Sequence, residues 1–142
     1  MTDPLPETRS VVVEREIPFP PEKIWRALTQ PHLIEEWLMK NDFKAVVGHR
    51  FDLRADWGAV DCQVVEVEPN KTLSYTWNVT RDDAANDLKS VVTWTLTQTS
   101  TGTRLRMEQS GFRPDQPRYY GGAKAGWPRF FAALEQVVAR LE

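Results

Sequence analysis

The residue types that most often carry chemistry are few and scattered in this chain of 142 residues. His32 and His49 have no second histidine, cysteine or carboxylate at a spacing that suits a metal ion, so no metal site is expected. Cys62 has no histidine near it in sequence and lies in an expected strand, which favours a buried inert thiol over a nucleophile. The chain also has no GxSxG elbow and no phosphate-binding loop. These residue types predict neither a catalytic residue nor a cofactor.

Aromatic and apolar side chains form a more informative pattern. Six tryptophans are unusual in a chain of this length. Either they fill a core, or several of their faces line a cavity for a small molecule, as is common in ligand sites. The side chains expected to face such an interior come from alternating strands and from a C-terminal helix: Phe51, Leu53, Tyr75, Trp77, Val92, Trp94, Leu105, Met107, Trp127, Phe130 and Phe131.

Polar side chains on the same inward faces are the candidates to orient a ligand, namely Arg15, Tyr75 and Gln109. Burying an unpaired arginine is costly. Arg15 is therefore expected to meet Glu108 or Glu66, a ligand anion, or solvent. An ordinary salt-bridged or surface arginine is the competing interpretation.

The elements that would position these residues follow from periodicity. Alternation and turn signals predict strands at 10–17, 42–46, 50–55, 60–67, 72–79, 90–98 and 103–112. Two short helices, at about 21–29 and from Pro31 to about Met39, separate the first two strands, because apolar residues recur there at helical spacing. Residues 1–7 are expected to form a loose tail and residues 81–87 a polar loop.

The last segment is predicted to be helical. Its apolar stripe runs along one face and consists of Trp127, Phe131, Leu134, Val138 and Leu141. Asp115 is the expected cap. Pro128 is unfavourable inside a helix, so either the helix begins near Gly126 or a longer helix is kinked there. Tyr119 and Tyr120 would form a lid over a cavity or simply anchor the loop.

Short turns between consecutive strands predict antiparallel pairing. One strand, two short helices, six strands and a long helix then make a single α+β domain over residues 1–142. A curved sheet of about seven strands, covered on its apolar face by the long helix, is an economical way to bury both.

Charge and hydropathy exclude several partners. The net charge is −2 and there is no basic run, so no nucleic acid is expected. No apolar stretch approaches the roughly 20 residues that span a bilayer, and the first ten residues lack the features of a secretory signal. A single cysteine fits a reducing compartment, so a cytoplasmic location is expected.

Several sequence blocks resemble a known family. They are VEREIPFPPEKIWRALTQPHLIEEW (13–37), VVEVEPNKTLSYTW (64–77), SVVTWTL (90–96), GTRLRMEQSGF (102–112) and the pair Gly126-Trp127. In this order they resemble bacterial proteins similar to the activator of heat-shock-protein-90 ATPase. These belong to the START-like superfamily, also called Bet v 1-like, polyketide-cyclase-like or SRPBCC.

The resemblance implies a helix-grip fold with a cavity between the sheet and the C-terminal helix. Members of such a superfamily differ in function, so it does not imply a shared reaction. Where many relatives carry histidine near the end of the last strand this chain has Gln109, and Pro128 follows the familiar Gly-Trp pair. The role of that histidine in relatives is therefore not carried over.

Three functions follow as hypotheses. The first is a non-catalytic binding protein for a hydrophobic, lipid-like or aromatic small molecule. The second is an enzyme of the cyclase or aromatase type, in which Glu66, Glu108 or Tyr75 would have to act as general acid or base. The third is a stress-response module that docks on a chaperone. The sequence leaves open whether the protein is a monomer or a weak homodimer.

Overall fold

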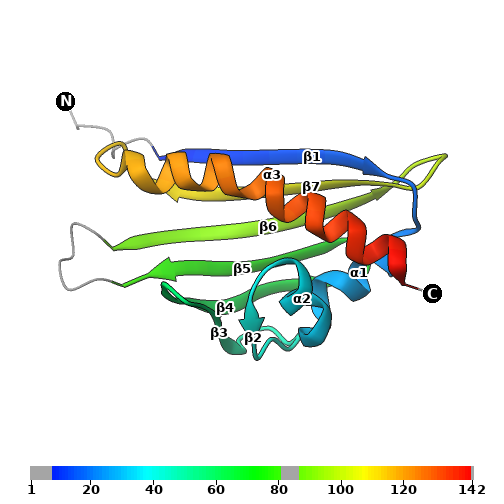
Figure 1. Cartoon of the computed structure of the whole chain (residues 1–142), viewed down its shortest axis with the longest axis horizontal. Coiled ribbons are helices and arrows are strands. Elements are labelled where there is room, and N and C mark those ends of the chain that lie inside the picture. The colour runs from blue at the N-terminus through cyan, green and yellow to red at the C-terminus, as the bar shows by residue number, and fades with distance from the viewer. Residues whose placement is uncertain (1–7, 81–86, 142) are drawn as a thin grey trace.

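The segments that alternate between apolar and polar residues pair into one sheet in the computed structural model, which describes residues 8–80 and 87–141 (Figure 1). The elements are β1 (Arg9–Ile17), α1 (Pro21–Thr29), α2 (Pro31–Trp37), β2 (Lys40–Asn41), β3 (Arg50–Ala55), β4 (Gly58–Glu68), β5 (Thr72–Val79), β6 (Leu88–Gln98), β7 (Thr103–Phe112) and α3 (Pro117–Arg140). The strand order across the sheet is β1-β7-β6-β5-β4-β3-β2, and every neighbouring pair is antiparallel. The α+β fold class and the order of elements are confirmed. The expected tail at 1–7 and most of the expected loop at 81–87 lie outside the described residues.

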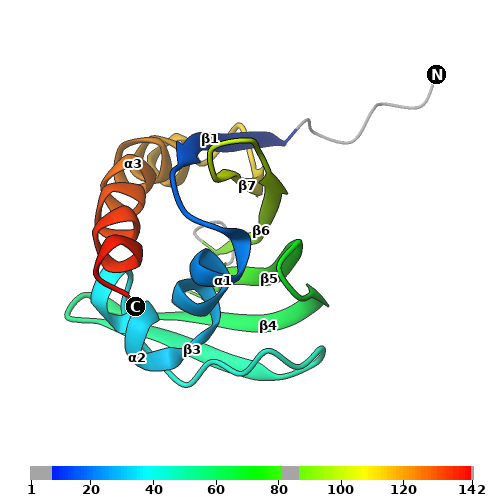
Figure 2. The same cartoon turned by 90° about the vertical axis from the view of Figure 1, so that its right-hand side faces the viewer.

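The sheet curves, and α3 lies across the open side of the curve (Figure 2). Helices α1 and α2 pack beneath the C-terminal part of α3. The Trp37 indole N–H donates to the carbonyl oxygen of Ala27 at 2.8 Å and joins the two short helices. A salt bridge of 3.1 Å between Arg140 and Glu36 joins α2 to α3. This arrangement is the predicted helix-grip fold.

The concave face of the sheet carries the core. Along β6 the buried and outward-facing residues alternate, and Val92 and Trp94 are fully buried. On β7 Leu105 and Met107 are likewise fully buried. The face of α3 that meets them is formed by Trp127, Phe131, Leu134, Val137 and Val138. The predicted apolar stripe is confirmed up to Val138, and Leu141 follows the helix end.

The strand predicted at 42–46 is wrong. Strand β2 covers only Lys40–Asn41, and side chains then take over the hydrogen bonds that a longer strand would make. The Asn41 side-chain oxygen accepts from the backbone N–H of Phe43 at 3.1 Å, and the Asp42 carboxylate accepts from the backbone N–H of Asp52 at 2.9 Å. Asn and Asp side chains that bond nearby backbone compete with strand pairing in this way.

Helix α3 is continuous through Pro128, so the longer of the two predicted helices is present. Asp115 does not cap it. Its N-cap is Gln116, which makes no side-chain capping bond, and the Asp115 carboxylate instead accepts two hydrogen bonds from Arg113 at 3.0 and 3.1 Å. No helix within residues 8–80 and 87–141 is long and apolar enough to cross a membrane.

Candidate ligand-binding site

Tryptophans fill the centre of the interior. The Trp94 ring lies 5.6 Å from Trp37, 5.7 Å from Trp127 and 5.5 Å from Phe131, measured between ring centroids. Such edge-to-face and tilted contacts stabilise a packed aromatic core. The space between the middle of the sheet and the C-terminal half of α3 is therefore occupied by side chains.

A cavity of about 250 Å³ remains at one end, beside the first half of α3. Strands β5, β6 and β7 form its floor, α3 forms one wall, and Met39 with the β3–β4 turn forms another. Its lining residues are Met39, Trp57, Trp77, Val79, Leu88, Gln109, Phe112, Arg118, Tyr119, Gly122, Ala123, Gly126, Trp127 and Phe130.

Small residues on α3 create this space. Gly122, Ala123 and Gly126 recur at about one-turn spacing on the face that lines the cavity. A Cβ atom placed on Gly122 would meet no atom within 4 Å. Further along the same helix, Phe131 and Leu134 are buried against the sheet. The helix therefore leaves the cavity open in its first half and fills the core in its second.

A short hydrogen-bond network crosses the cavity floor and holds Gln109 in one orientation. The Gln109 side-chain oxygen accepts from the Trp127 indole N–H at 2.7 Å, and its amide N–H donates to the Ser90 hydroxyl at 3.0 Å. The Ser90 hydroxyl in turn donates to the carbonyl oxygen of Trp77 at 2.6 Å. This network joins α3 to three strands and satisfies a polar side chain that is only 2% exposed.

A β-bulge brings Phe112 into the same cavity. Strand β1 pairs Arg9 with Phe112 and Ser10 with Ser110, so Gly111 is an extra residue in β7. Its φ of 112° is one that glycine adopts without strain. The extra residue reverses the alternation, so that Gln109 and Phe112 are both buried although they lie three positions apart.

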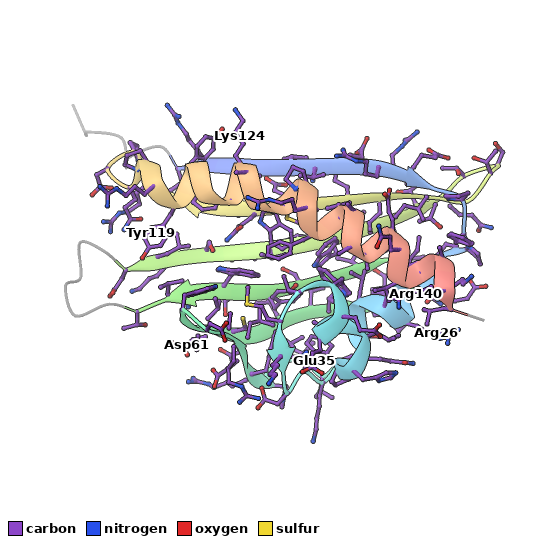
Figure 3. All side chains as sticks on the ribbon, in the orientation of Figure 1. Arg26, Glu35, Asp61, Tyr119, Lys124 and Arg140 are labelled. Carbon is purple, nitrogen blue, oxygen red and sulfur yellow. The ribbon has the colours of Figure 1, made fainter. Side chains whose placement is uncertain are left out.

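Trp57, Arg118 and Tyr119 line the outer part of the cavity. Trp57 lies in the β3–β4 turn and is 55% exposed, which is unusual for so large an apolar side chain. Tyr119 lies in the first turn of α3, near the ends of β5 and β6 (Figure 3). Tyr120 packs against Phe112 at 5.9 Å and does not line the cavity. The two interpretations of these tyrosines therefore apply to different residues. Tyr119 borders the cavity mouth, whereas Tyr120 anchors the start of the helix.

The structure distributes the predicted site residues between cavity and core. Trp77, Gln109, Trp127 and Phe130 line the cavity. The others that are buried do not line it: Phe51, Leu53, Tyr75, Val92, Trp94, Leu105, Met107 and Phe131. Arg15 is exposed; its guanidinium lies 6.0 Å from the Phe131 ring centroid and donates to the carbonyl oxygen of Glu14 at 3.2 Å. Of the partners expected for Arg15, solvent is the one found.

The groups considered as general acids or bases lie away from the cavity. Glu66 is exposed, and Glu108 forms a salt bridge of 3.0 Å with Arg106. The Tyr75 hydroxyl accepts a hydrogen bond from the Trp94 indole N–H at 3.1 Å, and burial raises the pKa of Tyr75 well above its ordinary value. A phenol in this setting stays neutral, and Tyr75 is therefore a structural residue of the core.

Another hollow, of about 480 Å³, lies on the outer face of β3, β4 and β5, and its lining includes Asp42, Asp52 and Asp61. Partial burial, followed by the charges of Asp61 and Asp42, raises the pKa of the Asp52 carboxyl. Within residues 8–80 and 87–141, no group of three or more His, Cys, Asp or Glu side chains is placed to hold a metal ion.

Sequence reasoning misses part of the cavity lining for identifiable reasons. Gly122 and Gly126 precede the apolar stripe that begins at Trp127, and glycine has no side chain that contributes to an apolar pattern. Their spacing of one helical turn, on a helix that is otherwise rich in large residues, is a usable signal. Simple alternation along β7 places Phe112 on the outward face, because it does not take the bulge into account. Apart from the glycine at position 111, the sequence gives no signal of that bulge. Trp57 lies in a turn, where periodicity carries no information.

Residues 18–139 match the family described as Activator of Hsp90 ATPase homolog 1-like protein. The chain belongs to this family. The match covers most of the domain, from the end of β1 to the last turn of α3. It confirms the superfamily that the sequence blocks resemble. No curated protein matches the chain.

Solved structures share the fold of this protein. Protein MLL2253 from Mesorhizobium loti is 72% identical, with a TM-score of 0.91, covering 94% of this chain and 99% of its own. DynU16, described as a putative protein in the dynemicin biosynthetic locus, is 25% identical, with a TM-score of 0.77 over 92% of this chain and 47% of its own. CalU16 from Micromonospora echinospora is 20% identical, with a TM-score of 0.76 over 94% of this chain and 78% of its own, and it shows the fold alone.

Proposed function

We propose that this protein binds a small aromatic molecule in the cavity beside the first half of α3. The observation that carries the proposal is the lining, in which Trp77, Trp127 and Phe130 surround a space whose buried polar group, Gln109, is already held by hydrogen bonds. Apolar walls with few fixed polar groups are typical of sites for small molecules.

The size of the cavity supports a compact ligand. Its volume is about 250 Å³, whereas an engineered cavity of about 150 Å³ is large enough to bind benzene. The cavity is therefore large enough for two fused aromatic rings but falls below the range of about 300–1,000 Å³ found for drug-sized ligands. A long acyl chain would not fit inside without extending through the mouth.

The lining supports binding in preference to catalysis. General acid–base chemistry needs a titratable group within hydrogen-bond reach of the reacting atom. Glu66, Glu108 and Tyr75 do not line the cavity, and Gln109 has no titratable proton. Among the described lining residues the one phenol, Tyr119, lies at the mouth, away from Trp77 and Gln109 on the floor. DynU16, whose sequence is 25% identical, is described as belonging to a biosynthetic locus, which supports a small organic molecule as the type of ligand.

Filling the cavity from α3 tests the proposal. We expect 2-naphthol, a neutral bicyclic probe, to bind the wild-type protein and to quench or shift its tryptophan emission. Gly122→Leu and Gly126→Leu place a side chain in the space and should weaken binding on the order of tenfold or more. Gly121→Leu is the matched control, because Gly121 lies on the same helix and does not line the cavity.

Replacing glycine by leucine inside a helix should stabilise all three variants by about 0.5–1 kcal/mol. Urea unfolding therefore separates loss of binding from loss of folding. Equal binding by Gly122→Leu, Gly126→Leu and Gly121→Leu would show that the probe binds elsewhere and would overturn the proposal. So would the absence of probe binding to the wild-type protein.

A further inference from the structure

Among the described residues that line the cavity, the charge has one sign. Among the described lining residues, Arg118 is the only one that carries a full charge at neutral pH. It lies in the first turn of α3, next to Tyr119 and one helical turn before Gly122. No described carboxylate lines the cavity beside it.

Arg118 is available to a ligand. Within residues 8–80 and 87–141 it makes no ion pair or hydrogen bond, whereas Arg104, Arg106, Arg113 and Arg140 all pair with carboxylates. Its side chain is exposed, so the guanidinium keeps its hydration and needs no partner in the free protein. A guanidinium presents a planar set of N–H groups that matches a carboxylate in two-point contact.

A second donor belongs to another residue of the cavity lining, Trp77. The indole N–H groups of Trp37, Trp94 and Trp127 donate to protein acceptors at 2.8, 3.1 and 2.7 Å. Trp77 lines the cavity and is 8% exposed, and its indole N–H makes no hydrogen bond to any described residue. A ligand that carries acceptor oxygens would complement both Arg118 and Trp77.

We infer that the ligand is an aromatic carboxylate of about two fused rings. The rings lie among Trp77, Trp127 and Phe130, and the carboxylate points to the mouth, where Arg118 binds it. This inference rests on the proposed function, since it adds the chemical class to the same cavity. Aromatic rings suit these walls better than a flexible aliphatic chain, because the flat indole and phenyl faces contact them closely and little chain entropy is lost.

Three probes separate the parts of the inference: 2-naphthoate, 2-naphthamide and octanoate. The first two share size and shape but differ in charge, and octanoate has the charge without the rings. Titrations of the full chain at low ionic strength should show 2-naphthoate binding about tenfold more tightly than 2-naphthamide, as one charge-assisted contact predicts. Octanoate should bind more weakly than 2-naphthoate. Added salt should reduce the preference for the anion, because Arg118 is exposed.

Arg118→Gln should abolish the preference for 2-naphthoate and leave 2-naphthamide binding unchanged. Lys124→Gln is the matched control, since it removes one positive charge from the same helix at a side chain that points away from β5 and β6 (Figure 3). Lys124→Gln should keep the preference. A general effect of net charge would appear equally in both variants and would overturn the role of Arg118.

The outcomes distinguish this inference from the proposed function. Equal binding of 2-naphthoate and 2-naphthamide by the wild-type protein would overturn the carboxylate while leaving the cavity as an aromatic site. Octanoate binding as tightly as 2-naphthoate would overturn the aromatic class. Failure of 2-naphthol, 2-naphthoate and 2-naphthamide alike would overturn the proposed function itself.

Discussion

At the residue scale, Gln109 links the packed core to the hollow part of the interior. Its side-chain oxygen and amide nitrogen are both engaged, by Trp127 and Ser90. The bonds hold the Trp127 ring where one part of it meets Trp94 in the core and another part borders the cavity. A glutamine can do this because it offers a donor and an acceptor on one planar group.

Replacing Gln109 by leucine should destabilise the protein by about 1–3 kcal/mol, since the indole N–H of Trp127 and the Ser90 hydroxyl would lose a buried partner. Urea unfolding of Gln109→Leu against wild type measures this cost. Gln98→Leu provides the control, because Gln98 is exposed at the end of β6 and should change stability little. Equal effects of the two substitutions would show that the network contributes nothing beyond ordinary strand packing.

At the scale of the element, the bulge in β7 determines which side chains reach the cavity. A Cβ on Gly111 would lie 2.6 Å from the Lys89 carbonyl oxygen and 3.1 Å from the Ser90 Cα, so the β6 and β7 backbones approach too closely for a side chain. The positive φ adds a second reason for glycine. Gly48 has a similar φ of 90°, but a Cβ at that position would meet no atom within 4 Å.

Gly111→Ala should therefore destabilise the protein by more than Gly48→Ala. The Gly48 substitution carries only the conformational cost of about 1–2 kcal/mol, and the Gly111 substitution adds displacement of the strand backbone. Thermal or urea unfolding of the two variants gives the comparison. If Gly111→Ala and Gly48→Ala lose the same free energy of unfolding, the backbone accommodates the new Cβ beside Lys89 and Ser90 without cost. The bulge would then not be tightly constrained.

The elements also show which features a sequence can predict. Strands β6 and β7 alternate as predicted as far as Gln109. In β5 the predicted inward residues Leu73, Tyr75 and Trp77 are buried, but Ser74 between two of them is buried as well. Prediction fails where side chains replace backbone partners, as Asp42 does for Asp52. It fails again where a single extra residue reverses the alternation before Phe112. Both are local exceptions to the two-residue alternation of a strand, so the periodicity of the sequence does not reveal them.

At the scale of the whole molecule, the interior is divided between a filled half and a hollow half. The sequence allows both interpretations of the tryptophans, and both apply: Trp94 fills the centre, whereas Trp77 borders the cavity. Which half a tryptophan joins depends on what α3 places opposite it. Glycine and alanine leave space near Trp77, and Phe131 removes it near Trp94. That pairing across the fold cannot be read from either element alone.

The packed half of the molecule contains two buried acids that stay neutral, Cys62 and Tyr75. Burial, followed by the charges of Asp52, Asp61 and Asp42, raises the pKa of the Cys62 thiol. Burial likewise raises the pKa of Tyr75. Because both pKa values are raised on folding, their contribution to stability is fully present below the unfolded pKa, and it is lost as pH rises toward the folded one.

The free energy of unfolding should therefore fall at alkaline pH, first through Cys62, whose unfolded pKa is about 8.5, and then through Tyr75, whose unfolded pKa is about 10. Between about pH 7.5 and about pH 9.5 the expected loss from Cys62 is about 1.4 kcal/mol. Urea unfolding under reducing conditions at both pH values, for wild type and Cys62→Ala, isolates this contribution, since every other titrating group is shared. Cys62→Ala should lose less stability across the interval than wild type. Parallel losses in the two proteins would show that the thiol ionises as readily in the folded protein as in the unfolded chain, which is incompatible with its burial on the concave face of β4.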